Sequence, residues 1–147
     1  MASFQIIVGS MLGGTEYVAE ACQETLETLG HQTALHLQPE FSEIPHLDHF
    51  WLICTSTHGA GDYPDNIQPF ISDLSKNKDD LSTTAYMVIG IGDSNYDTFC
   101  LAATNIDKLL KSNGCMKKVE TKLFDMNENI DPEALAQTWI SDQQDLF

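Results

Sequence analysis

The chain has 147 residues, a length that most simply forms one domain over residues 1–147 with its own core. It carries 22 acidic residues, 7 lysines and no arginine, so its formal net charge is −15. This charge disfavours nucleic acids and anionic membranes as partners, and it suits either simple solubility or docking to basic protein surfaces.

The cysteines and the amino-terminal sequence favour a cytoplasmic protein. Cys22, Cys54, Cys100 and Cys115 form no Cys-x-x-Cys pair and have no metal-binding spacing, so we expect buried thiols in a reducing compartment. The chain begins with no basic segment followed by an apolar stretch of signal-peptide length, and no window reaches transmembrane length. We expect a monomer without membrane contacts.

The first unit of the chain predicts a strand, a tight loop and a helix. An apolar run over residues 4–9 is followed by Ser10-Met11-Leu12-Gly13-Gly14-Thr15, which we call the first loop. Such a loop directs free N–H groups and the positive end of a helix toward one point, and its hydroxyls and glycines let a phosphate approach. The alternative is an ordinary strand-to-helix turn capped by Ser or Thr.

Two better-known phosphate-binding loops are excluded. A Walker loop ends in Gly-Lys-Ser/Thr, whereas Gly14 is followed by Thr15 and Glu16. The dinucleotide fingerprint requires Gly-x-Gly-x-x-Gly, and Gly9, Gly13 and Gly14 do not have that spacing.

Five segments have strand patterns, and the distribution of apolar residues in each predicts its place in a sheet. Residues 4–9, 50–54 and 86–89 are continuous apolar runs, typical of central strands buried on both faces. Residues 33–37 and 119–123 alternate, as edge strands do. Because helical patterns separate these segments, we predict an α/β three-layer sandwich with a five-stranded parallel sheet. Right-handed crossovers favour the strand order 2-1-3-4-5.

The helices are predicted from apolar spacing and end signals. Gly30 closes the first helix, a further helix ends near Gly114, and the last begins at Asp131-Pro132. Their expected buried residues share one face each: Val18, Cys22, Leu26 and Leu29; Ile67, Phe70, Ile71 and Leu74; Ala103, Ile106, Leu109 and Leu110; Leu135, Trp139 and Ile140.

Three specialised loops follow strands one, three and four, and so meet beyond the carboxyl ends of the sheet, where ligands bind in such folds. The second loop runs from Ser56 to Asn66 and the third from Gly92 to Cys100. Gly59 and Gly61 let backbone approach a flat ligand, and Tyr96 and Phe99 offer aromatic faces. Taken alone, Tyr96 would be a loop-packing residue, but three such loops in this order favour a binding site.

The three loops together resemble those of the flavodoxins. Ser10 to Thr15 is similar to the flavodoxin phosphate loop, and the second and third loops are similar to those of diflavin reductases. The resemblance covers nearly the whole chain and is closest to the MioC group, through Leu12-Gly13-Gly14, residues 16–20, 56–62 and 96–100. Flavodoxins are also the standard example of this strand order, with flavin mononucleotide (FMN) between strands one and three.

This resemblance implies an FMN-binding electron carrier. It implies that the first loop holds the phosphate, that Ser56, Thr57, His58 and Gly59 border the isoalloxazine ring, and that Tyr96 stacks on it. It also implies a carbonyl of Gly59-Ala60-Gly61 as a partner of the reduced ring, and a pocket completed by Gly92, Asp93, Asp97, Phe99 and Cys100. Leu12 replaces a common Thr, and His58 replaces an aromatic residue or Gln, so we expect modest FMN affinity.

The loops contain four aspartates and no lysine, so we expect basic redox partners, a flavodoxin-type reductase and a client enzyme. The resemblance implies biotin synthase as a client, although no residue identifies one. A flavin-dependent reductase enzyme is the first alternative, and steady NAD(P)H oxidation would favour it. A module without cofactor is the second, and failure to bind FMN would favour it.

Overall fold

The sheet of the protein is parallel throughout and has the strand order β2-β1-β3-β4-β5, with β6 also pairing with β4. We describe it from a computed structural model, in which residues 1–10, 13–58 and 60–147 are placed. The predicted order 2-1-3-4-5 is confirmed. The strands are β1 (Ser3–Gly9), β2 (Gln32–His36), β3 (Phe50–Ser56), β4 (Ala85–Gly92), β5 (Met116–Lys117) and β6 (Lys122–Asp125).

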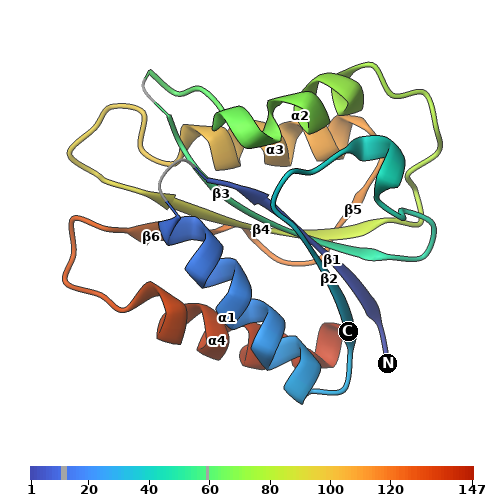
Figure 1. The fold of residues 1–147 in the computed structure, drawn as a ribbon, viewed down its shortest axis with the longest axis horizontal. Coiled ribbons are helices and arrows are strands. Elements are labelled where there is room, and N and C mark those ends of the chain that lie inside the picture. Colours follow the sequence, from blue (N-terminus) through green and yellow to red (C-terminus); the bar gives the residue numbers. More distant parts are fainter. Residues whose placement is uncertain (11–12, 59) are drawn as a thin grey trace.

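Among the described residues, four helices cover the two faces of the sheet, which gives the predicted three layers (Figure 1). They are α1 (Gly14–Thr28), α2 (Gln68–Ser75), α3 (Leu101–Ser112) and α4 (Pro132–Asp142). Short 3-10 turns lie at Phe41–Glu43, Asp65–Ile67 and Gln144–Leu146. Helices α1 and α4 pack on one face and α2 and α3 on the other, and each face has its own apolar core. No helix within the described residues has the length and apolarity that a membrane crossing requires.

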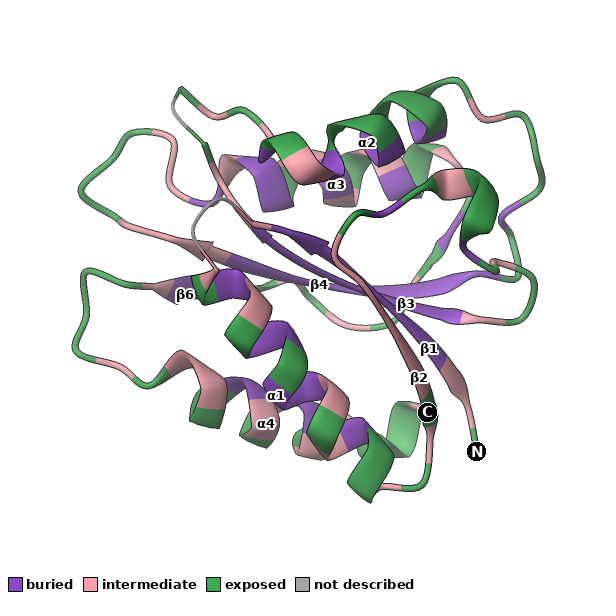
Figure 2. Ribbon diagram, in the orientation of Figure 1, coloured by how far each residue is buried: buried purple, intermediate pink, exposed green. Residues whose placement is uncertain are grey.

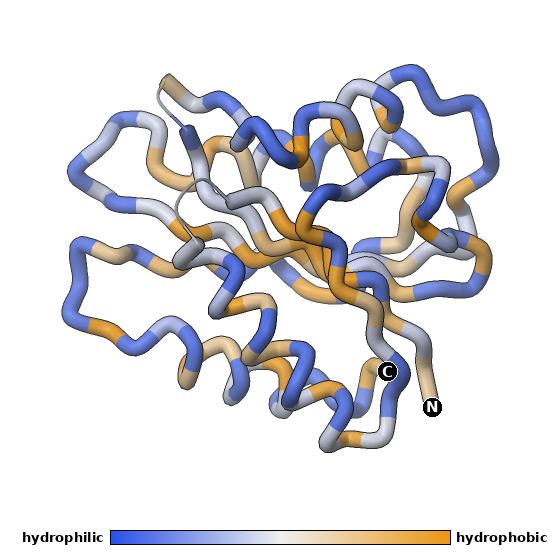
Figure 3. Tube along the Cα trace, in the orientation of Figure 1, coloured by the Kyte–Doolittle hydropathy of each residue, from blue (hydrophilic) through white to orange (hydrophobic). Residues whose placement is uncertain are grey.

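Burial follows the apolar patterns closely. The central strands β1, β3 and β4 are buried on both faces, whereas β2 is half-buried along most of its length (Figure 2). The hydropathy of the chain shows the same contrast between an apolar sheet and polar outer surfaces (Figure 3). Gly30 and Gly114 adopt positive φ after α1 and α3, where paired hydrogen bonds such as His31 N–H to Leu26 O close the helix ends.

Two details differ from the sequence prediction. The fifth strand is divided into β5 and β6, and Lys117, at the end of β5, pairs with Asp107 and Glu120. The alternating residues 119–121 therefore lie outside the strand. In α4, Leu135 is 43% exposed rather than buried, and Ala136 takes the buried position beside Ile140.

Candidate functional site

Four loops meet at the carboxyl ends of the strands, at the left of Figure 1. They are the three predicted loops and a fourth, residues 126–131, between β6 and α4. The arrangement follows from the parallel sheet, because each strand delivers its following loop to the same edge. The site is therefore assembled from segments that are far apart in the sequence.

The first loop brings hydroxyls to the start of α1. Gly13 is the N-cap residue at φ 89°, and its N–H donates to Ser10 Oγ at 3.1 Å. The hydroxyl of Ser10 accepts this bond and keeps its own hydrogen available for another acceptor. Because the first N–H groups of any helix lack intrahelical partners, the head of α1 adds donors and a positive dipole end. Met11 and Leu12, both predicted site residues, lie outside the described residues.

A cavity of about 550 Å³ opens between the first loop, the second loop and the head of α4. Its lining includes the hydroxyl-bearing residues Ser10, Thr15, Ser56 and Thr57 together with apolar residues such as Val18, Ile91 and Met126. We call it the hydroxyl-lined cavity; its complete lining is Ser10, Gly14, Thr15, Val18, Ser56, Thr57, His58, Ile91, Met126, Pro132 and Glu133. It can accept a ligand that carries both an acceptor-rich group and an aliphatic chain.

The second loop is closed on itself and tied to α3. His58 and Asp62 exchange backbone hydrogen bonds, both 2.8 Å long, so the tip of the loop forms a tight antiparallel bridge. Thr57 Oγ1 accepts the N–H of Ala102 at 3.0 Å, in the first turn of α3. Thr57 therefore caps α3 while it faces the site. Gly59, also a predicted site residue, lies outside the described residues.

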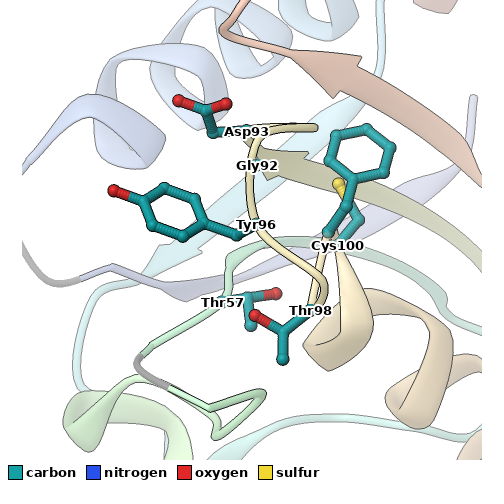
Figure 4. Close-up of a pocket in the computed structure, with 7 residues that line it drawn as sticks. Thr57, Gly92, Asp93, Tyr96, Thr98 and Cys100 are labelled. Carbon is teal, nitrogen blue, oxygen red and sulfur yellow. The ribbon is translucent and has the colours of Figure 1, made fainter.

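The third loop folds tightly around a second cavity of about 290 Å³ (Figure 4). A Cβ at Gly92 would lie 3.0 Å from both the backbone nitrogen and Sγ of Cys100, so glycine is needed where the loop returns to its start. The Tyr96 side chain is 68% exposed and points away from Cys100. We call this the third-loop cavity; it is lined by Thr57, Gly92, Asp93, Tyr96, Thr98, Phe99 and Cys100.

The fourth loop braces the third, a feature that the sequence reasoning missed. Asp125 Oδ1 accepts the N–H groups of Ser94 and Asn127, each at 3.0 Å, and Met126 N–H donates to Gly92 O at 2.7 Å. Asn95 Nδ2 also donates to Asn127 Oδ1 at 2.9 Å. The signal was present in the sequence, since Asp125-Met126-Asn127 follows the fifth strand at the same edge of the sheet.

The electrostatics of the site are set by carboxylates. Hydrogen bonds from Ser94 hold the pKa of the Asp125 carboxyl below its usual value, so it stays ionised. Burial, helped by the charge of Asp125, raises the pKa of the Cys100 thiol to about 12. The Cys100 thiol is therefore neutral near pH 7 and packs at the base of the third loop.

The predicted site residues that the structure describes lie around the two cavities or just outside them. Ser10, Gly14, Thr15, Ser56 and His58 line the hydroxyl-lined cavity, and Gly92, Asp93, Tyr96, Phe99 and Cys100 line the third-loop cavity. Thr57 lines both, so the two cavities adjoin at this residue. Gly13 heads α1, Ala60 and Asp97 are exposed, and Gly61 packs against Leu101 beside a separate cavity.

Thr57 has hydroxyls and a helix end on one side and an aromatic loop on the other. Together with this sheet topology, that arrangement defines the flavodoxin-like class of α/β proteins. The chain belongs to the flavodoxin family: the family model described as flavodoxin matches residues 6–139. Members of this family are electron carriers that use a flavin, typically FMN, and act with redox partners.

Individual relatives agree with this assignment. The chain is 41% identical to the protein MioC of Escherichia coli over 140 residues, which is 95% of each chain. It is 42% identical to a MioC homolog of Haemophilus influenzae over 135 residues, 92% of each chain. A cysteine-to-alanine mutant of a flavodoxin from Pseudomonas aeruginosa superposes with a TM-score of 0.89 at 28% identity, covering 98% of this chain and 97% of the other. The resemblance to the MioC group is thus confirmed.

Proposed function

We propose that the chain binds one FMN across the two adjoining cavities and carries single electrons from a reductase to a client enzyme. The observation that supports this most directly is the position of Thr57, which joins a hydroxyl-lined cavity to an aromatic one. FMN has the matching shape, with an anionic phosphate at one end and a flat ring at the other. The two volumes, about 550 and 290 Å³, leave room for both parts.

The residues present suit such a ligand. Ser10, Thr15 and the head of α1 would hold the phosphate through hydroxyl and N–H donors, since no lysine lies in the loops. Gly92 to Cys100 would border the ring, with the exposed Tyr96 side chain covering one face. FMN, when bound, supplies the one-electron chemistry, and the protein orients it and shields it from water.

Partner choice would be governed by charge. Asp62, Asp65 and Asp97 are exposed at the loop edge, where a bound flavin would have to meet its partner. Since exposed charges of one sign steer an oppositely charged protein, a basic reductase and a basic client surface are the expected partners. Biotin synthase is the client that the likeness to the MioC group suggests.

Stopped-flow kinetics test the electron-carrier proposal. FMN-loaded protein mixed with NADPH alone should stay oxidised, and it should be reduced when a basic flavodoxin reductase is added. Replacing Asp62, Asp65 and Asp97 together with Asn should slow that reduction by about 10-fold or more at low salt and flatten its salt dependence.

Two outcomes would count against the proposal. Steady NADPH oxidation by the protein without a reductase would favour an enzyme. A reduction rate that is insensitive to salt, or unchanged in the triple variant, would instead indicate an apolar docking surface.

A variant with Asp73, Asp79 and Asp80 replaced by Asn is the matched control. These residues lie away from the loops, and their replacement removes the same amount of charge.

A further inference from the structure

One side chain outside both cavities connects the first loop to the rest of the fold. Asn66 lies in the 3-10 turn Asp65–Ile67, at the end of the second loop, and is half-buried. Its Oδ1 accepts the N–H of Ser10 at 2.9 Å, and its Nδ2 donates to Val8 O at 2.7 Å and to Leu37 O at 3.0 Å. A single amide therefore joins the ends of β1 and β2 to the second loop.

The geometry of these bonds imitates a strand. In a parallel ladder, one residue donates to the carbonyl before its partner and accepts from the N–H after it. Asn66 makes this pair of bonds around Gly9, with Val8 O on one side and Ser10 N–H on the other. The last residue pair between β1 and β2 is Ile7 with His36. The two strands separate beyond this pair, and the amide of Asn66 supplies the hydrogen bonds that the next residue of β2 would otherwise make.

These hydrogen bonds of Asn66 fix the position of Ser10. Its N–H is engaged by Asn66, so it is directed into the fold and is not a donor for a ligand. Its hydroxyl accepts from Gly13 N–H, which connects it to the head of α1. A chain of hydrogen bonds therefore runs from Asn66 through Ser10 to Gly13, and Ser10 is its member that lines the hydroxyl-lined cavity.

We propose that Asn66 is a positioning residue for the phosphate end of the flavin site. It fixes the first residue of the phosphate loop, and through Ser10 the head of α1, while the ring end is held by separate bonds from Asp125 and Asn127. Only an amide can accept from Ser10 and donate to two carbonyls at once. This inference rests on the proposed binding of FMN, and it predicts a selective effect on the phosphate.

The test compares FMN with riboflavin, which has the same ring and ribityl chain but no phosphate. Asn66→Ala should raise the dissociation constant for FMN by about 10–100-fold, because misplaced charge-assisted bonds to the phosphate are lost. The riboflavin constant should change by less than about 3-fold. Both are measured by flavin fluorescence titration, with a melting curve for each variant. If Asn66→Ala does not fold, Asn66→Gln keeps the amide but displaces it, and should show the same selectivity with a smaller effect.

Two variants serve as controls. Gln68→Ala removes another side-chain amide near the same loop; it donates to Tyr63 O and to Asp65 Oδ1 and has no hydrogen bond to Ser10, Gly13, Gly14 or Thr15, the described residues of the first loop, so both constants should stay unchanged. Asn95→Ala weakens the brace of the third loop, so it should weaken FMN and riboflavin by the same factor. The FMN-to-riboflavin ratio thus separates loss of positioning from general loss of structure.

The possible outcomes are distinguishable. If wild-type protein binds FMN more tightly than riboflavin and Asn66→Ala weakens both equally, or neither, the positioning role is overturned while the proposed function stands. If the wild type binds both flavins equally, no phosphate site exists at the first loop and Asn66 positions none. If the wild type binds neither flavin, both the proposed function and this role are wrong.

Discussion

Gly13 is the residue of the first loop whose replacement has the most specific expected result. It is the N-cap of α1 at φ 89°, in the left-handed region, and its carbonyl accepts the N–H of Tyr17 at 3.3 Å. A Cβ added there would meet no described atom within 4 Å, so steric overlap does not contribute. The cost of a side chain comes from the backbone alone.

That cost can be estimated and checked against a neighbour. Left-handed backbone costs an L-residue about 1–2 kcal/mol, so Gly13→Ala should lower the free energy of unfolding by that amount. For a chain of this length the melting temperature should fall by roughly 3–8 °C. Gly13→Asn should lose less, because Asn tolerates this region. Gly14→Ala, at the first helical position without positive φ, should be neutral or stabilising by up to about 1 kcal/mol.

Thermal and urea denaturation of the flavin-free protein measure these differences. The expected stability order is Gly14→Ala, wild type, Gly13→Asn and Gly13→Ala, from most to least stable. Gly13→Val should in addition abolish FMN binding in a folded protein, because a β-branched side chain would occupy the space through which the phosphate approaches the loop. A Gly13→Ala protein as stable as the wild type, or equal losses for Ala and Asn, would refute the backbone argument.

Three further predictions concern other parts of the structure. Tyr96→Ala should weaken FMN binding by about 1–3 kcal/mol in fluorescence titration and leave the melting temperature nearly unchanged, since the side chain is 68% exposed; equal affinity would remove Tyr96 from the site. Burial raises the pKa of Cys100 to about 12 and of Cys115 to about 11, so alkylation of both at pH 8 should be slowed roughly a hundred-fold or more until urea unfolds the chain; rapid native labelling in mass spectrometry would contradict their burial. Burial and the hydrogen bond to Asp107 raise the pKa of Tyr86, so the stability that the protonated Tyr86 hydroxyl contributes is complete below about pH 10 and is lost as the pH rises above that. Tyr86→Phe should therefore flatten the decline of the unfolding free energy at alkaline pH, and an unchanged slope would show that other groups cause the decline.

The central fold was predictable because it depends on local patterns. Continuous apolar runs identified β1, β3 and β4, since strands buried on both faces exclude polar residues. The divided fifth strand was not predicted, because the alternation of residues 119–123 does not show which of them pair with β4. Leu135 was placed in the core by helical spacing, yet α4 buries Ala136 instead.

The meeting of the three loops was predictable, and the contacts within them were less so. The carboxyl-end rule placed the three loops together, but pairs of residues far apart in sequence decide what each residue does. Asn66 contacts Ser10 across 56 positions, and no local pattern reveals such a bond. Gly61 was predicted to let backbone approach a ligand, and the structure adds a second need for glycine there, since φ is positive and a Cβ would overlap Leu101. Glycine content alone does not separate these two uses.

The most direct test of the central claim is a titration of the flavin-free protein with FMN, followed by flavin fluorescence and the visible spectrum. We expect saturable one-to-one binding, quenched fluorescence and a shifted flavin spectrum, because Tyr96 and the third loop would enclose the ring. A folded protein that leaves FMN fluorescence and absorbance unchanged at saturating concentrations would contradict the assignment of the two cavities to FMN.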